Sequence, residues 1–125
     1  MAMKTGIRRI LIADDHAAVR NGIRSLLEPW PQMQVVAEAA SGAEALEIAR
    51  SSTPDIAIMD LSLPGGQGID LILGVKRESP ETQVLIYTMY RSEKLVRAAL
   101  FAGASFYVVK GDPSSDLLAA LMNCR

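Results

Sequence analysis

Five side chains that could take part in one reaction stand where apolar stretches of the sequence end: Asp14, Asp15, Asp60, Thr88 and Lys110. A carboxylate can attack phosphorus and form an acyl phosphate. An ammonium group, a hydroxyl and a divalent cation can then bind or neutralise the oxygens of the transferred group. If these ends of the stretches meet in space, the residue types predict a phosphoryl-transfer site.

The three acids of this set also predict a metal ion. Nearby carboxylates repel one another, and each would otherwise favour its protonated form. Lys110 offsets one negative charge, and a divalent cation would offset the other two. Carboxylate ligands favour a hard ion, so the expected cofactor is Mg²⁺. Asp60 stands alone, which makes it the expected nucleophile and leaves the Asp14–Asp15 pair to hold the metal. Because Mg²⁺ prefers oxygen ligands, we expect His16 at the surface, in the first turn of a helix.

The elements that must position these residues alternate along the chain. Five apolar stretches, expected as strands, lie at 8–15, 33–40, 55–60, 82–88 and 105–110. Five amphipathic stretches, expected as helices, lie at 16–30, 41–53, 66–79, 92–104 and from 113 onward. Apolar strands without alternation indicate a parallel sheet with helices on both faces, which is a doubly wound α/β fold.

Ligands of such folds bind at the carboxyl ends of the strands. Four of the five expected strands end in the chemically useful side chains, and the second, which ends near Ala39 and Ala40, supplies none.

Several residues predict where the helices begin and end. Ser41 and Glu44 have the spacing of a capping box at the start of the second helix. Gly103 is the expected stop of the fourth helix. Asp112 is a candidate cap for the last helix, with Pro113 in its first turn.

The composition excludes several classes of protein. A chain of 125 residues, half of them apolar, suits one domain with one core. A net charge of −1 gives no basic footprint for nucleic acid, and no apolar run approaches the length of a membrane span. The N-terminus lacks a signal-peptide core. Cys124 is the only cysteine, so no internal disulfide forms, and we expect a cytoplasmic protein with no membrane partner.

Four motifs carry a resemblance to a known family: DD at 14–15, MDLSLPGGQG around Asp60, YT at 87–88 and GASFYVVK ending at Lys110. With them the chain resembles, over nearly its whole length, the receiver domain of bacterial two-component response regulators. The DDH and KGD segments look most like the NarL/FixJ subfamily, whose receivers precede a LuxR-type helix-turn-helix. The resemblance implies one receiver domain over residues 1–125 and a flavodoxin/CheY-like sheet of strand order 2-1-3-4-5.

The same resemblance assigns roles at the site. Asp60 matches the phosphoacceptor, Asp15 the direct metal ligand and Asp14 the acid that orients metal-bound water. The backbone carbonyl of Ser62 matches the third protein ligand of the metal. Many receivers have a proline, often cis, directly after the lysine, whereas Gly111 follows here.

Three further roles concern the phosphoryl group and the switch that follows. Thr88 matches the hydroxyl that follows the phosphoryl group, and Lys110 matches the lysine of the motif. Tyr107 matches the aromatic switch that turns inward when Thr88 moves. The implied function is therefore a phosphorylation switch that transfers the phosphoryl group to its own aspartate and is not a turnover enzyme.

The implied partners are a sensor histidine kinase, a second copy of the chain after phosphorylation, and DNA through a C-terminal domain that this chain is expected to lack. The main alternative is a receiver-like interaction module that works without phosphorylation. A haloacid-dehalogenase-like phosphatase would carry a second acid where Ser62 stands. A flavodoxin-like FMN module has the same general architecture and is the remaining alternative.

Overall fold

A computed structural model describes residues 6–65 and 68–124, and it confirms the expected fold. Five parallel strands form one sheet in the order β2-β1-β3-β4-β5. The strands are β1 (Arg8–Ala13), β2 (Met33–Ala39), β3 (Ile56–Met59), β4 (Gln83–Thr88) and β5 (Ala104–Val109). The helices are α1 (Ala17–Leu27), α2 (Gly42–Ser52), α3 (Ile69–Glu78), α4 (Glu93–Ala102) and α5 (Ser114–Asn123). Gly66 and Gln67 of the GGQG segment lie outside the described residues.

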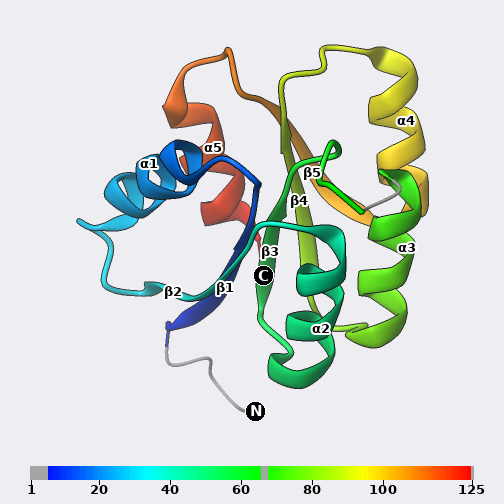
Figure 1. Ribbon diagram of the computed structural model, residues 1–125. Helices are drawn as coiled ribbons and strands as arrows, with labels where there is room; N and C mark the ends of the chain where they lie inside the picture. Colours follow the sequence, from blue (N-terminus) through cyan, green and yellow to red (C-terminus); the bar gives the residue numbers. More distant parts are fainter. Residues whose placement is uncertain (1–5, 66–67, 125) are drawn as a thin grey trace.

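The helices cover both faces of the sheet, which explains why the strands lack a polar face. Figure 1 shows α1 and α5 on one side of the sheet and α2, α3 and α4 on the other. Within β1, Leu11 packs into the core under α2, α3 and α4, while Ile10 and Ile12 pack into the core under α1 and α5. All three side chains are fully buried. Each such side chain contributes about 1.5 to 3 kcal/mol to folding, so the two cores hold the sheet edge in place.

The predicted capping box forms at the start of α2 with a small difference. The Ser41 hydroxyl accepts a hydrogen bond from the Glu44 N–H at 3.2 Å, as expected. The Glu44 carboxylate accepts from the N–H of Ala40 at 2.8 Å, one residue before the usual partner. Both bonds satisfy N–H groups that would otherwise lack partners at the helix start.

The predicted cap of the last helix is wrong. Pro113, not Asp112, occupies the N-cap position of α5, and that position makes no side-chain cap. The Asp112 carboxylate instead forms an ion pair with Arg91 from the loop between β4 and α4. No peptide bond in the described part of the chain is cis, so the segment after Lys110 turns without one.

Gly103 ends α4 as predicted, and its replacement should lower stability. The φ angle of Gly103 is 119°, and an added Cβ would lie 3.1 Å from Cγ of Lys76. We expect Gly103→Ala to lower the free energy of unfolding by about 1 to 2 kcal/mol, because L residues are strained at this φ. Chemical denaturation measures the change.

Gly22 supplies the matched control for this prediction. It lies inside α1, and an added Cβ there meets no heavy atom within 4 Å. Gly22→Ala should therefore raise the free energy of unfolding by about 0.5 to 1 kcal/mol. Equal effects of the two substitutions would contradict the conformational explanation.

Among the described helices, none is long and apolar enough to cross a bilayer.

Candidate functional site

The parallel register brings the ends of four strands to the same edge of the sheet. The Asp60 N–H donates to the carbonyl oxygen of Ala13 at 3.1 Å, so the pairing of β1 and β3 continues to the acids that follow them. The Lys110 N–H donates to the carbonyl oxygen of Thr88 at 2.7 Å, which does the same for β4 and β5. The structure therefore gathers the predicted side chains at the expected edge.

Lys110 connects the two most buried acids. Its Nζ lies 2.7 Å from Oδ2 of Asp14 and 2.8 Å from Oδ2 of Asp60. The side chains of both acids are 3% exposed, and that of Lys110 is 10% exposed. Charges buried to this extent persist in proteins when they are paired, so each carboxylate depends on the shared ammonium group.

The second oxygen of Asp60 is held by Ser62. The Ser62 N–H donates to Oδ1 of Asp60 at 3.1 Å, and the Ser62 hydroxyl lies 3.2 Å from the same oxygen. This Asx-type turn fixes the carboxylate at the end of β3 and explains why a buried strand ends on an acid. Ser62, expected to act through its backbone carbonyl, thus also contacts Asp60 through two other groups.

The folded structure lowers the pKa of Asp60 and raises the pKa of Lys110. Burial alone would raise the pKa of Asp60, but hydrogen bonds from Lys110 and Ser62, with a smaller effect of Thr88, place it below its ordinary value. Burial alone would lower the pKa of Lys110, but hydrogen bonds and attraction to Asp14 and Asp60 place it above its ordinary value. Both groups are therefore charged at neutral pH.

These directions predict how stability depends on pH without metal. A lowered pKa in the folded state means that ionised Asp60 stabilises the fold above its unfolded pKa of about 3.9, and that this contribution disappears as pH falls through the folded value. The raised pKa of Lys110 gives a contribution that is complete below about pH 10.4 and disappears as pH rises through the folded value.

We therefore expect wild type in EDTA to be more stable than Asp60→Asn at neutral pH. The gap should close as the solution is made acid below about pH 4. Urea denaturation at a series of pH values measures the gap. A gap that stays constant into acid would contradict the lowered pKa.

Asp14 and Asp15 both lie against His16. Potential ligand atoms of Asp14, Asp15 and His16 lie within 4.8 Å of one another, the one such group of three found among the described residues. The His16 N–H donates to Oδ1 of Asp14 at 2.9 Å, and its ring Nδ1 lies 3.1 Å from Oδ1 of Asp15. The His16 side chain is 67% exposed, as expected for a surface residue.

The donor set suits a hard divalent cation. Asp14 and Asp15 have carboxylate oxygens close to one another, and Lys110 links Asp60 to Asp14. One ammonium group leaves an excess of negative charge among the three acids, which a cation would offset. Asp60 is not part of the compact group with His16. The predicted metal ligands and this compact group therefore have Asp14 and Asp15 in common.

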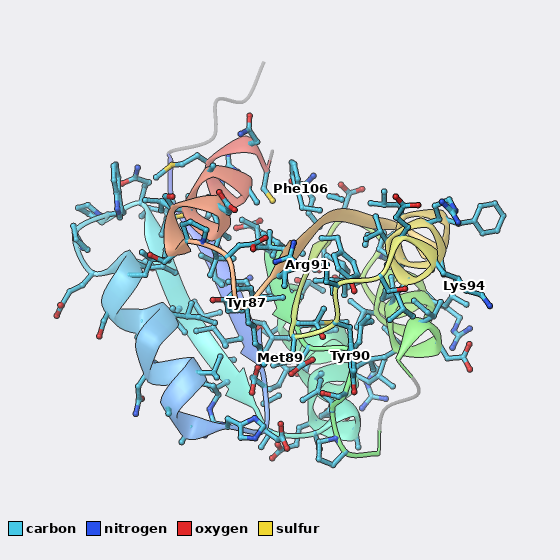
Figure 2. All side chains as sticks on the ribbon, turned by 90° about the horizontal axis from the view of Figure 1, so that it is seen from above. Tyr87, Met89, Tyr90, Arg91, Lys94 and Phe106 are labelled. Carbon is cyan, nitrogen blue, oxygen red and sulfur yellow. The ribbon has the colours of Figure 1, made fainter. Side chains whose placement is uncertain are left out.

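Thr88 and Tyr107 lie beside the loop that joins β4 to α4. Thr88 is fully buried, and its Oγ1 lies 3.5 Å from the N–H of Tyr90. The Tyr107 hydroxyl donates to the carbonyl oxygen of Tyr90 at 2.6 Å. Figure 2, which views the carboxyl edge of the sheet, shows Met89, Tyr90 and Arg91 along this loop. The loop is thus held by the predicted switch tyrosine and by the Arg91–Asp112 pair.

Two residues near the site were not predicted. Arg20 of α1 donates to the backbone carbonyl of Asp14 at 2.6 Å and to Glu38 of β2 at 2.8 Å. Glu38 comes just before the last residue of β2, so the prediction from the last residues of the strands assigned no site residue to that strand. The available signal was a pair of arginines four residues apart on α1, Arg20 and Arg24, together with one acid near the end of β2.

The sequence matches one family model over most of its length. The family described as "Response regulator receiver domain" matches residues 10–122. Among curated proteins, the oxygen regulatory protein NreC of Staphylococcus haemolyticus is 42% identical over 114 residues, covering 90% of this chain and 52% of that protein. The DNA-binding transcriptional activator DevR/DosR of Mycobacterium tuberculosis is 39% identical over 113 residues, with the same coverage. The chain spans about half the length of these relatives.

Solved structures agree with the fold. A two-component response regulator of the LuxR family from Aurantimonas sp. SI85-9A1 superimposes with a TM-score of 0.87 at 40% identity, covering 93% of this chain and 83% of the other. The isolated REC domain of RcsB from Salmonella enterica serovar Typhimurium, solved with the phosphomimetic BeF3-, has a TM-score of 0.87 at 32% identity, covering 93% and 86%.

Proposed function

This chain belongs to the response regulator receiver domain family, with the LuxR/NarL type among its relatives, and from that premise we propose that Asp60 accepts a phosphoryl group from a sensor histidine kinase. The observation that carries the proposal is the bridge from Lys110 to Asp60 and Asp14 at the carboxyl edge of the sheet. This bridge supports the proposal, because phosphoryl transfer needs a charged nucleophile beside a cation that offsets the charge of the transferred group.

In the proposed step, a carboxylate oxygen of Asp60 attacks the phosphorus of a phosphohistidine. The new O–P bond forms as the P–N bond breaks, and its electron pair returns to the imidazole nitrogen. Lys110 neutralises charge on the phosphoryl oxygens, and Thr88 donates a hydrogen bond to one of them. The lowered pKa of Asp60 keeps the nucleophile ionised at neutral pH.

Asp14, Asp15, Asp60 and the carbonyl oxygen of Ser62 are the residues proposed to hold Mg²⁺. When bound, Mg²⁺ would neutralise charge on the phosphoryl oxygens and align them for transfer. His16 is proposed to turn away from Asp15, which its 67% exposed side chain has room to do. The carboxylates would then offer their oxygens to the ion.

The proposed response begins at Thr88. When its hydroxyl follows the phosphoryl group, Tyr107 turns inward and gives up its hydrogen bond to the Tyr90 carbonyl. The surface around α4, β5 and α5 then changes, as a local charge event biases an element with two states. We propose that this surface controls dimerisation and, in a longer protein, a LuxR-type domain that binds DNA.

Acetyl phosphate tests this function with the chain alone. We expect Mg²⁺ and acetyl phosphate together to add one phosphoryl group to the intact protein, measured by mass spectrometry, with the adduct mapped to the peptide that contains Asp60. EDTA should prevent the adduct. If no adduct forms with acetyl phosphate or with a phosphorylated kinase domain, the phosphorylation-independent interaction module becomes the better account.

A further inference from the structure

We infer that Arg20 is a positioning residue of the phosphoryl-transfer site, because it fixes the peptide group that joins Asp14 to Asp15. Its guanidinium forms two hydrogen bonds in different directions. Nη1 donates to the carbonyl oxygen of Asp14 at 2.6 Å, and Nε donates to Oε1 of Glu38 at 2.8 Å. The inference rests on the proposed function, since it explains how that site is held.

The peptide group matters because both acids are attached to it. The Asp14 carbonyl belongs to the peptide bond that leads into Asp15, so rotation of this group would move the two carboxylates relative to each other. The Asp14 N–H is already fixed, since it donates to the carbonyl oxygen of Ala39 at 2.9 Å. Arg20 therefore supplies the remaining backbone bond of Asp14 and completes its orientation.

Burial makes this bond costly to lose. Asp14 is 2% exposed, so water has little access to its groups. A buried carbonyl without a partner is disfavoured, and the loop would shift to find one. The movement would take the Asp14 and Asp15 side chains away from the arrangement that a cation needs.

Glu38 is the anchor that holds Arg20 in place. The two oxygens of its carboxylate accept from Arg20 and from Arg24, and Figure 1 shows α1 lying beside β2. The hydrogen bond from Arg24 lowers the pKa of Glu38 most, burial raises it, and the bond from Arg20 lowers it further, so the pKa lies below its ordinary value. The carboxylate is therefore ionised at neutral pH, and it connects the strand that supplies no site residue to the acid loop.

Arg24 provides a matched control. Its side chain binds the same carboxylate as Arg20, but within the described part of the chain its only hydrogen-bond acceptor is Glu38. Arg24→Gln thus removes one charge and one ion pair of Glu38 without touching the acid loop. Arg20→Lys keeps the charge but lacks the rigid fork that reaches both partners.

The test measures Mg²⁺ binding by calorimetry and amide hydrogen exchange of Asp15 and His16 in metal-free protein. We expect Arg20→Gln and Arg20→Lys to weaken Mg²⁺ binding by about tenfold or more and to speed exchange at both amides. Arg24→Gln should change Mg²⁺ affinity less than about twofold, and its thermal stability should fall less than that of Arg20→Gln, because among the described residues Arg24 bonds only to Glu38.

Two results would overturn the inference: Arg20→Lys with the affinity and exchange of wild type, or Arg24→Gln with the same loss of Mg²⁺ binding as Arg20→Gln. In either case wild type would still take up Mg²⁺ and a phosphoryl group, and the proposed function would stand. A wild type that binds no Mg²⁺ would instead refute the proposed function, and amide exchange would still decide whether Arg20 orders the loop.

Discussion

Asp60→Asn is expected to abolish the phosphoryl adduct formed with acetyl phosphate and Mg²⁺. The amide lacks the anionic oxygen that attacks phosphorus, and no other described acid combines the burial of Asp60 with contacts to both Lys110 and Ser62. The variant keeps the size of the side chain, so the sheet and both cores should persist. Mass spectrometry measures the adduct, and circular dichroism checks the fold.

Asp55→Asn is the control for this loss. Asp55 precedes β3 at the opposite end of the strand, where its Oδ2 accepts a hydrogen bond from the N–H of Arg9 at 2.8 Å. Its replacement should reduce stability without reducing the adduct. An adduct of wild-type yield in Asp60→Asn, mapped to Asp14 or Asp15, would show that the nucleophile has been assigned to the wrong acid.

Lys110→Met is expected to slow phosphorylation by about 100-fold or more, because it removes the fixed cation that is proposed to neutralise the charge of the transferred group. It should also lower the free energy of unfolding by about 3 kcal/mol in EDTA, because Asp14 and Asp60 would stay buried without their partner. Added Mg²⁺ should stabilise this variant more than wild type, since the ion would replace part of the lost positive charge.

Lys76→Met separates the two effects. Lys76 is also a well-connected lysine, and its Nζ donates to the carbonyl oxygens of Pro80 at 3.0 Å and Thr82 at 2.8 Å, at the far end of the sheet. The substitution should cost stability but leave the phosphorylation rate within about twofold of wild type. A Lys110→Met variant that reacts at the wild-type rate would remove Lys110 from the proposed reaction.

The sequence predicted the fold because local patterns and the sheet agree. Unbroken apolar strands such as ILIA allow one arrangement, with helices on both faces, and parallel strands then bring their carboxyl ends together. The Ser41 cap depends only on residues a few positions from Ser41, and the Gly103 stop only on residues a few positions from Gly103. Predictions of this kind need no knowledge of distant neighbours.

The missed features depend on distant neighbours. Asp112 has the right position for a cap, but Arg91 binds its carboxylate across the gap between two loops. Arg20 and Glu38 are 18 residues apart and meet only because α1 packs beside β2. Their spacing gives a weak signal, since charges on a helix face usually point to solvent. The features that could not be predicted from the sequence are therefore those that depend on contacts between distant residues.

The Lys110–Asp14 contact joins residues 96 positions apart. While the protein is being translated, the lysine leaves the ribosome long after the acid loop and the first four strands. A nascent chain therefore lacks the complete proposed site until β5 has joined the edge of the sheet, however well its earlier segments have folded. Phosphorylation at the proposed site would in this way require that the chain be synthesised through β5, and fragments that end before β5 should be silent to any phosphodonor.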